Sequence, residues 1–175
     1  NWNLGNASSS TETNPIFTYA NAGNYTINLT VSSSNGCNAS TSKVAQVYQN
    51  PVVKFSSAVA CNADTTYFTN QSTIATGTLT YVWKFTATDS STVKNGKFVF
   101  PNANTYTVAL KAISDKNCTA STSNLVEVKP LPSPDFTTKT VCIGEVTNCT
   151  NTSTIVAPLD QNQLTYSWVF DNGKT

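Results

Sequence analysis

The chain has 175 residues, of which 39% are hydrophobic and 10% aromatic, so it can bury the core of at least one domain. Only 11% of the residues are charged, and 10 basic against 9 acidic residues give a net charge of +1, too weak a field to attract nucleic acid or an anionic membrane. The sequence contains no histidine, which disfavours zinc sites and excludes Ser-His-Asp triads and Cys-His pairs. We therefore expect no enzyme activity and no cofactor.

The surface is expected to be neutral and rich in small polar groups, because Thr, Asn and Ser together occupy 69 positions. No segment resembles a signal peptide, and no apolar run approaches the roughly 18 residues of a membrane span, so we expect no membrane insertion by this segment. The abrupt ends at Asn1 and Thr175 predict a window cut from a longer polypeptide.

An internal repeat with a period of 81 residues organises the chain. Pairs at this offset include Trp2/Trp83, Phe17/Phe98, Tyr25/Tyr106, Leu29/Leu110, Cys37/Cys118, Phe55/Phe136 and Cys61/Cys142. The offset between Trp83 and Trp168 is 85, because residues 156–163 replace a shorter polar loop at 75–78. The repeats predict the C-terminal part of a first unit at 1–51, a complete unit at 52–132 and the N-terminal part of a third at 133–175, called repeats 1, 2 and 3 below.

Within repeat 2 the apolar residues alternate with a period of two, which predicts strands and no helices. The expected strands, bounded by Ser, Thr, Asn, Gly or Pro, are 52–57, 65–70, 79–86, 97–100, 106–113 and 121–129. About seven short strands in some 80 residues are typical of two facing sheets. The fold class is therefore all-β, with tandem immunoglobulin-like β-sandwiches joined by short Pro-containing linkers.

Aromatic residues at equivalent repeat positions are the expected structural core. Each repeat contributes one tryptophan on a strand covered by the opposite sheet, and Tyr25 and Tyr106 are expected to form tyrosine corners, in which the hydroxyl bonds to the backbone. The predicted core residues are Trp2, Trp83, Trp168, Tyr25, Tyr106, Phe55, Phe68 and Phe136.

The residues from Trp2 to Cys37 resemble the PKD (polycystic-kidney-disease-type) domain. They carry the motif order Trp-x-Leu-Gly-Asn, Ser-Ser-Ser-Thr-Glu, Asn-Pro-x-x-x-Tyr, Gly-x-Tyr-Thr-x-x-Leu-x-Val and Asn-Gly-Cys. Repeats 2 and 3 are similar to the tandem variety on secreted Bacteroidota surface proteins such as gliding-motility adhesins, in which a Cys precedes an element like Phe68-Thr69-Asn70-Gln71-Ser72. The resemblance implies an extracellular or cell-surface spacer or adhesion module and names no ligand.

The sequence departs from the family where an acidic turn is expected. The Trp-Asp-Phe-Gly-Asp-Gly element becomes Trp2-Asn3-Leu4-Gly5-Asn6 in repeat 1 and Trp83-Lys84-Phe85-Thr86 in repeat 2. A Ca²⁺ site needs six to eight oxygen ligands, several of them carboxylates. No repeat offers such a cluster, and Asp171 is interpreted as a turn residue, so no metal site is predicted.

Five cysteines without a Cys-x-x-Cys motif indicate structural sulfur in an oxidising compartment. In an immunoglobulin-like topology Cys61 and Cys118 lie at opposite ends of their unit, separated by roughly 23 Å, whereas a disulfide allows about 4.4 to 6.8 Å between Cα atoms. We expect no bond between them and a bridge between neighbouring units instead. The candidate inter-unit cysteines are Cys37, Cys61, Cys118 and Cys142, while Cys149, where repeat 2 has Phe68, is expected to be a buried free thiol.

Two functions remain open from the sequence. The favoured one is a structural spacer in a large extracellular repeat adhesin or cell-surface filament, with a role in surface adhesion or gliding motility. Its partners would be neighbouring repeats of the same chain, like chains in a filament, or a surface polysaccharide. The alternative is a glycan- or protein-binding accessory module of a secreted hydrolase or adhesin, for which Tyr48, Tyr67 and Tyr81 are the candidate exposed aromatic residues.

Overall fold

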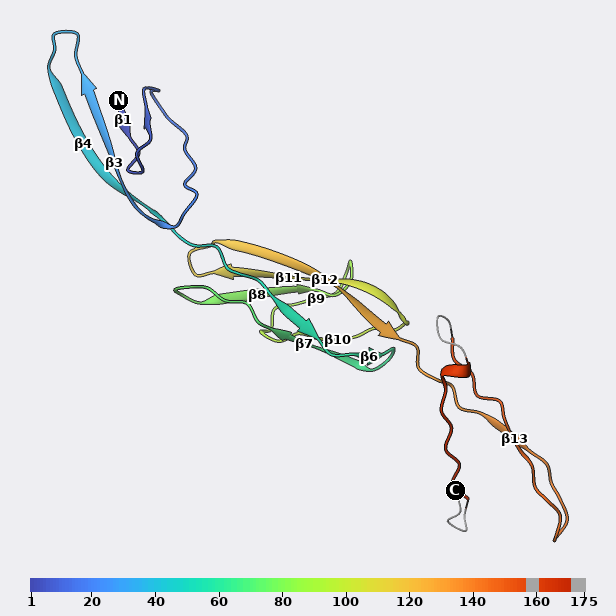
Figure 1. The fold of residues 1–175 in the computed structure, drawn as a ribbon. Helices are drawn as coiled ribbons and strands as arrows, with labels where there is room; N and C mark the ends of the chain where they lie inside the picture. Colours follow the sequence, from blue (N-terminus) through green and yellow to red (C-terminus); the bar gives the residue numbers. More distant parts are fainter. Residues whose placement is uncertain (157–160, 171–175) are drawn as a thin grey trace. The chain divides into compact units, whose positions relative to one another are not determined.

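The computed structural model describes residues 1–156 and 161–170, and the secondary structure there is strand apart from one 3-10 turn, η1 (Gln161–Gln163) (Figure 1). The all-β prediction is confirmed. Among the described residues, none of the helical structure is long and apolar enough to cross a bilayer.

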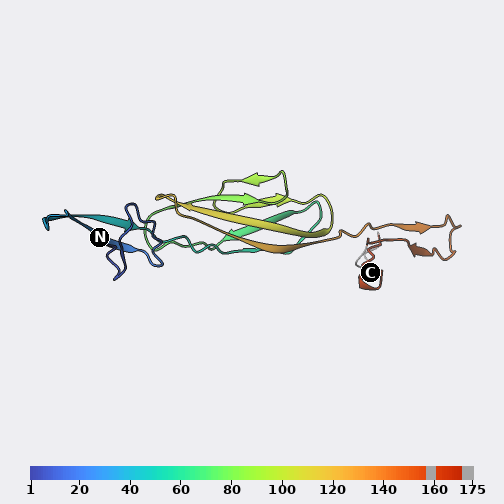
Figure 2. The ribbon, with the colours of Figure 1, turned by 90° about the horizontal axis from the view of Figure 1, so that it is seen from above.

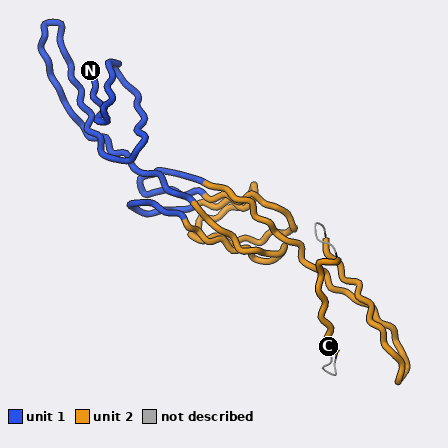
Figure 3. Tube along the Cα trace, in the orientation of Figure 1, with its two compact units in different colours: residues 1–53, 72–81, 111–121 blue, residues 54–71, 82–110, 122–175 orange. Residues whose placement is uncertain are grey.

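Two compact units divide the chain (Figure 3). The first contains residues 1–53, 72–81 and 111–121, and the second contains residues 54–71, 82–110 and 122–175. The boundary falls inside three long strands of repeat 2, so these compact units do not coincide with the sequence repeats.

Repeat 1 forms one four-stranded antiparallel sheet with the order β2-β1-β3-β4. Its strands are β1 (Trp2–Asn3), β2 (Ser9–Ser10), β3 (Gly23–Ser32) and β4 (Asn38–Val47). The hairpin of β3 and β4 is the longest pairing, running from Gly23↔Val47 to Ser32↔Asn38. Gly36, with φ of 84°, supplies the left-handed turn conformation that the hairpin connection needs.

Repeat 2 forms two sheets (Figure 1, Figure 2). The first has the order β10-β7-β5, and the second has the order β6-β12-β11-β8-β9. The strands are β5 (Phe55–Ser57), β6 (Ala60–Cys61), β7 (Thr65–Asn70), β8 (Leu79–Lys84), β9 (Ser90–Ser91), β10 (Lys97–Val99), β11 (Asn104–Ser114) and β12 (Thr119–Lys129). The predicted strand 65–70 has these bounds, while those at 106–113 and 121–129 are longer than predicted and the two-residue strands β6 and β9 were not foreseen.

Repeat 3 contributes a two-stranded antiparallel sheet of β13 (Phe136–Thr138) and β14 (Cys149–Asn151). An isolated bridge between Ser133 and Thr154 extends this pairing. The same bridge links Val52 and Thr73 in repeat 2, so the two repeats begin in the same way.

The core of repeat 2 lies between its two sheets. Trp83 on β8 is 0% exposed, and its ring centroid lies 5.1 Å from that of Phe55 on β5 and 5.5 Å from that of Phe68 on β7. Alternate residues of β11 and β12 close the same layer, among them Val108, Leu110, Val126 and Val128, all buried. Repeat 2 is thus a β-sandwich whose aromatic residues join the two sheets.

Tyr25 and Tyr106 form tyrosine corners at equivalent positions of repeats 1 and 2. The Tyr106 hydroxyl donates to the Asn102 carbonyl at 2.9 Å, and the Tyr25 hydroxyl donates to the Asn21 carbonyl at 2.9 Å. Each bond spans four residues and fixes the loop that leads into the long strand β11 or β3.

Tyr106→Phe removes one side-chain hydrogen bond and keeps the ring that stacks on Phe100 at 4.2 Å. We expect a loss of about 1 kcal/mol in the free energy of unfolding, the usual net value of such a bond. Urea unfolding followed by circular dichroism measures it. An unchanged midpoint would show that the corner bond adds nothing to stability.

In the outer repeats several predicted core residues are more exposed than their counterparts in repeat 2, and their place in a core stays a prediction. Phe136 is 55% exposed, Trp2 and Trp168 are only half-buried, and Cys149 is half-buried rather than enclosed. The physical reason is that repeat 1 has no counterpart of β5 and β7, and repeat 3 as described has no counterpart of β11 and β12. A sheet whose facing sheet is missing leaves its inward side chains in contact with solvent.

Candidate functional site

The three tyrosines considered for glycan binding lie in different parts of the chain. Tyr67 is 61% exposed on β7 of the three-stranded sheet, and Tyr81 is half-buried on β8 of the five-stranded sheet. Tyr48 lies in the linker after β4. They do not form one aromatic platform on a shared sheet.

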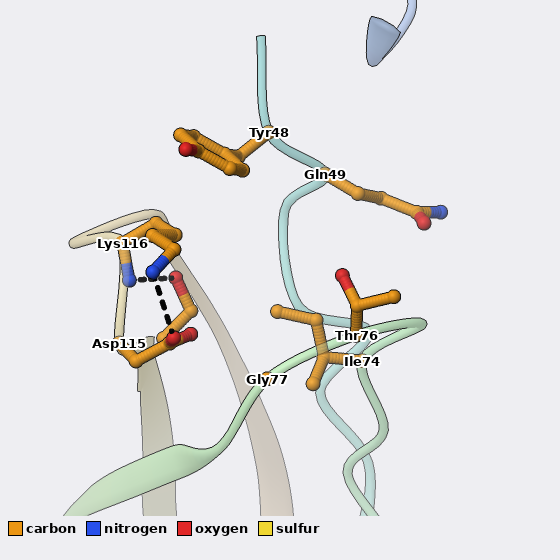
Figure 4. A pocket seen from close by; sticks show the side chains of 8 residues that line it. Tyr48, Gln49, Ile74, Thr76, Gly77, Asp115 and Lys116 are labelled. Atoms are coloured by element: carbon orange, nitrogen blue, oxygen red, sulfur yellow. Dashed lines mark hydrogen bonds and ion pairs between the residues drawn. The ribbon is translucent and has the colours of Figure 1, made fainter. Parts of the chain in front are cut away.

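Tyr48 is instead part of a contact with the loop between β11 and β12. The Lys116 ammonium lies 5.8 Å from the centre of the Tyr48 ring, within cation–π range, and also pairs with the Asp115 carboxylate at 3.2 Å (Figure 4). On the same loop, Cys118 Sγ lies 4.0 Å from the Tyr48 carbonyl oxygen. Two residues of the loop, Lys116 and Cys118, therefore lie close to a single linker residue, and all of these residues belong to the first compact unit.

Hydrogen bonds within and beside this loop also fix its conformation. The buried Ser114 hydroxyl accepts from the backbone N–H of Lys116 at 3.3 Å and of Cys118 at 3.1 Å. The Asp115 N–H donates to the Thr78 carbonyl at 3.1 Å, and Gly77 with φ of 93° allows the neighbouring loop to approach closely. We call the contact of the linker residues Tyr48 and Gln49 with Gly77 and Ser114–Lys116 the joint.

A cavity of about 170 Å³ lies at the joint. It is lined by Tyr48, Gln49, Ile74, Thr76, Gly77, Ser114, Asp115 and Lys116 (Figure 4). The volume is below the roughly 300 to 1,000 Å³ of typical small-molecule pockets. The charges of Asp115 and Lys116 at this cavity already pair with each other. The cavity therefore suits packing against a linker better than binding a ligand or performing catalysis.

The five cysteines are free thiols in the structure. Cys61 lies on β6 opposite Lys129, at the C-terminal end of β12, whereas Cys118 directly precedes Thr119 at the start of β12. Cys37 and Cys142 are exposed. The prediction of bridges between units stays a prediction.

Across the described residues, 1–156 and 161–170, no group of three or more metal-ligating side chains comes together. Asp171, interpreted above as a turn residue, lies outside them. The joint was not predicted from the sequence. Gly77 in the run Thr76-Gly77-Thr78 was an available signal for a close approach of two loops. The spacing of residues along the chain does not indicate that Lys116 lies near Tyr48.

One family model matches part of the chain. The PKD domain model matches residues 1–47. Among solved structures, the PKD1 domain of the Vibrio cholerae metalloprotease PrtV is 23% identical, covering 46% of this chain and 98% of that chain with a TM-score of 0.43. The PKD1 domain of Vibrio anguillarum Epp is 28% identical with the same coverage and a TM-score of 0.42. None of the curated proteins compared with the chain is significantly similar to it.

Proposed function

We propose that this chain is a non-catalytic, extracellular structural segment in which PKD-type β-sandwich repeats act as spacers in a surface adhesin or filament. The PKD match over residues 1–47 and the 81-residue period support the tandem arrangement. On this proposal the neighbours of each repeat are the other repeats of the chain, and adhesion or gliding contacts with other chains or a surface polysaccharide occur elsewhere.

The joint is the observation that carries this proposal. A spacer keeps its domains at a fixed distance and orientation only if the linkers between them are stiff. A short linker becomes stiffer when its side chains pack on a neighbouring loop. Here Pro51 is buried, the Tyr48 ring meets Lys116, and the Tyr48 carbonyl meets Cys118. The linker residues are therefore held by contacts rather than left as a free tether.

Distances between two spin labels, one on each side of the linker, test how stiff the linker is. In a chain with all five cysteines changed to Ser, labels at Ser42→Cys on β4 and Leu125→Cys on β12 should give one narrow distance distribution. Changing Tyr48 and Lys116 together to Ala should broaden it, because the contacts that hold the linker are lost. Tyr67→Ala is the control, because Tyr67 is an exposed tyrosine outside the joint, and it should leave the distribution narrow.

The spacer proposal fails if the parent distribution is already as broad as that of the double variant. A parent that is narrow but unaffected by the double variant would mean that the stiffness does not come from the joint. The first result would favour the alternative of a flexibly tethered binding module, and the second would remove the joint as the support for the spacer.

A further inference from the structure

One sheet of repeat 2 is narrower than the sheet that faces it, with the order β10-β7-β5 against β6-β12-β11-β8-β9. β12 lies over β5, because Asn124 Nδ2 donates to the Phe55 carbonyl at 3.2 Å. The end of β8 lies over β10, because Phe85 stacks on Phe98 with ring centroids 5.0 Å apart. β9 extends the larger sheet beyond β8. Among the described residues, no strand occupies the position beside β10 that faces β9.

The outer edge of β10 offers unpaired backbone groups. β10 pairs with β7 in antiparallel register, and the Phe68 N–H donates to the Gly96 carbonyl at 2.9 Å. Because antiparallel strands bond at alternate residues, the backbone of Phe98 bonds to β7 and the backbone groups of Lys97 and Val99 point away from it. Within the described part of the chain, nothing bonds to these groups. The edge therefore presents two donors and two acceptors.

The other edge of the same sheet is covered. The Ala58 N–H donates to the Tyr67 carbonyl at 3.0 Å, so the backbone groups of Phe55 and Ser57 on β5 point away from β7. The outward Phe55 carbonyl accepts the Asn124 side-chain amide from the facing sheet. A side chain of the larger sheet thus closes the edge at β5, while the edge at β10 stays open.

The side chains at the open edge differ between its two faces. On the inner face, Phe98 is half-buried, although its cross-strand partner Thr66 is 0% exposed. On the outer face, Val99 is 48% exposed and Lys97 is exposed. Lys97 is the one charged side chain among the outward residues of the three strands, which are Ser56, Thr65, Tyr67, Thr69, Lys97 and Val99. A strand added here would meet an apolar ring inside and a positive charge outside.

We propose that repeat 2 binds an extended segment of a partner polypeptide as a fourth strand, antiparallel to β10. The segment forms backbone hydrogen bonds with Lys97 and Val99. It places an apolar residue opposite Phe98, where that side chain fills the space under β9, and an acidic residue opposite Lys97. A β-branched residue opposite Val99 completes the pattern. This inference goes beyond the spacer function and does not depend on it.

A single extended segment fits this edge better than a second folded copy of the chain does. If β10 of another copy paired here, each copy would bring its own β9, which extends beyond β8, into the same space above the paired strands. An extended segment brings no facing sheet with it. The partner is therefore a polypeptide that offers an unpaired strand.

The first test measures binding of a fluorescein-labelled peptide, Thr-Thr-Val-Ile-Glu-Thr-Thr, to the whole chain by fluorescence anisotropy. In antiparallel register its Val, Ile and Glu lie opposite Val99, Phe98 and Lys97. We expect saturable binding with a dissociation constant on the order of 0.1 mM, typical of a small interface. In the complex, hydrogen exchange of the Lys97 and Val99 amides should slow, because both amides then donate to the peptide.

Val99→Pro removes one outward N–H and no bond to β7, so the strand should remain folded, as proline is tolerated at such edge positions. The peptide affinity should fall about tenfold or more, because a backbone bond is lost and the ring obstructs the edge. Ser57→Pro is the matched control, because its N–H also points away from β7 but lies on the other edge of the sheet. It should leave the peptide affinity unchanged.

A charge reversal tests the register without relying on a proline variant. Lys97→Glu should weaken binding of the Glu peptide by about two- to fivefold and strengthen binding of a peptide with Lys in place of Glu by a similar factor. Equal effects on both peptides would show that Lys97 does not lie opposite that residue, and would overturn the proposed register.

Two further outcomes would overturn the proposal. The absence of saturable binding would mean that the shortness of β10 and the charge of Lys97 protect this edge against pairing. Binding that leaves the exchange of the Lys97 and Val99 amides unchanged, or that Ser57→Pro weakens as much as Val99→Pro does, would place the peptide elsewhere on the chain. Neither outcome bears on the stiffness of the linker, which the spin-label distances measure.

Discussion

Trp83→Ala should lower the free energy of unfolding of repeat 2 by about 3 to 5 kcal/mol, the range for removing a large aromatic side chain from a core. Trp83 on β8 is 0% exposed, and its ring packs against Phe55 and Phe68 of the facing sheet and lies 6.0 Å, between ring centroids, from Phe85, the residue that follows β8. The substitution also removes the indole bond to the Val93 carbonyl at 3.0 Å. The cavity lies where the sheets meet, so neither sheet can collapse into it without losing its register.

Hydrogen exchange of amides in β8 and β11 measures this loss locally, which avoids assigning one unfolding energy to a chain with several repeats. Trp168→Ala is the matched control, because Trp168 is half-buried and packs on the exposed Phe136. It should change the β8 and β11 amides by only a few tenths of a kcal/mol. Equal effects of the two substitutions on those amides would disprove the special role of Trp83.

The sequence predicts positions in a strand better than it predicts burial. Phe55 and Phe136 are equivalent by the 81-residue period, and both begin a short strand, yet their exposed fractions are 4% and 55%. Alternation along a strand determines which side chains share a face. Whether that face is covered depends on strands far away in the sequence, and for Phe136 the described residues supply none.

The short edge strands and the joint were not predicted, because they also depend on residues far apart in the sequence. β6 and β9 have two residues each, too few to show a period, and they exist because β12 and β8 offer free edges. At the joint, Lys116 meets Tyr48 across a separation of 68 positions that no repeat spacing encodes. The tyrosine corners were predicted, because their bonds reach only four residues along the chain.

Gly96→Ala is the substitution with the second-largest expected effect. Gly96 is buried, and a Cβ there would lie 3.1 Å from Phe85 Cζ and 3.1 Å from two atoms of the Trp83 indole. The backbone cannot easily withdraw, because the Gly96 carbonyl accepts from the Phe68 N–H at 2.9 Å. The rings must therefore shift, and overpacking of this kind destabilises by about 1 to 3 kcal/mol.

Gly23→Ala is the matched control, since a Cβ there meets the Tyr25 ring at 3.6 Å, an ordinary contact. It should be neutral or stabilising by a few tenths of a kcal/mol to about 1 kcal/mol, because alanine restricts the unfolded chain. Combining Gly96→Ala with Phe85→Leu tests the mechanism: the smaller side chain makes room for the methyl group, so the double variant should be more stable than the sum of the two single losses predicts. Strict additivity would mean that the methyl group does not press on Phe85 and that the loss arises in the backbone instead.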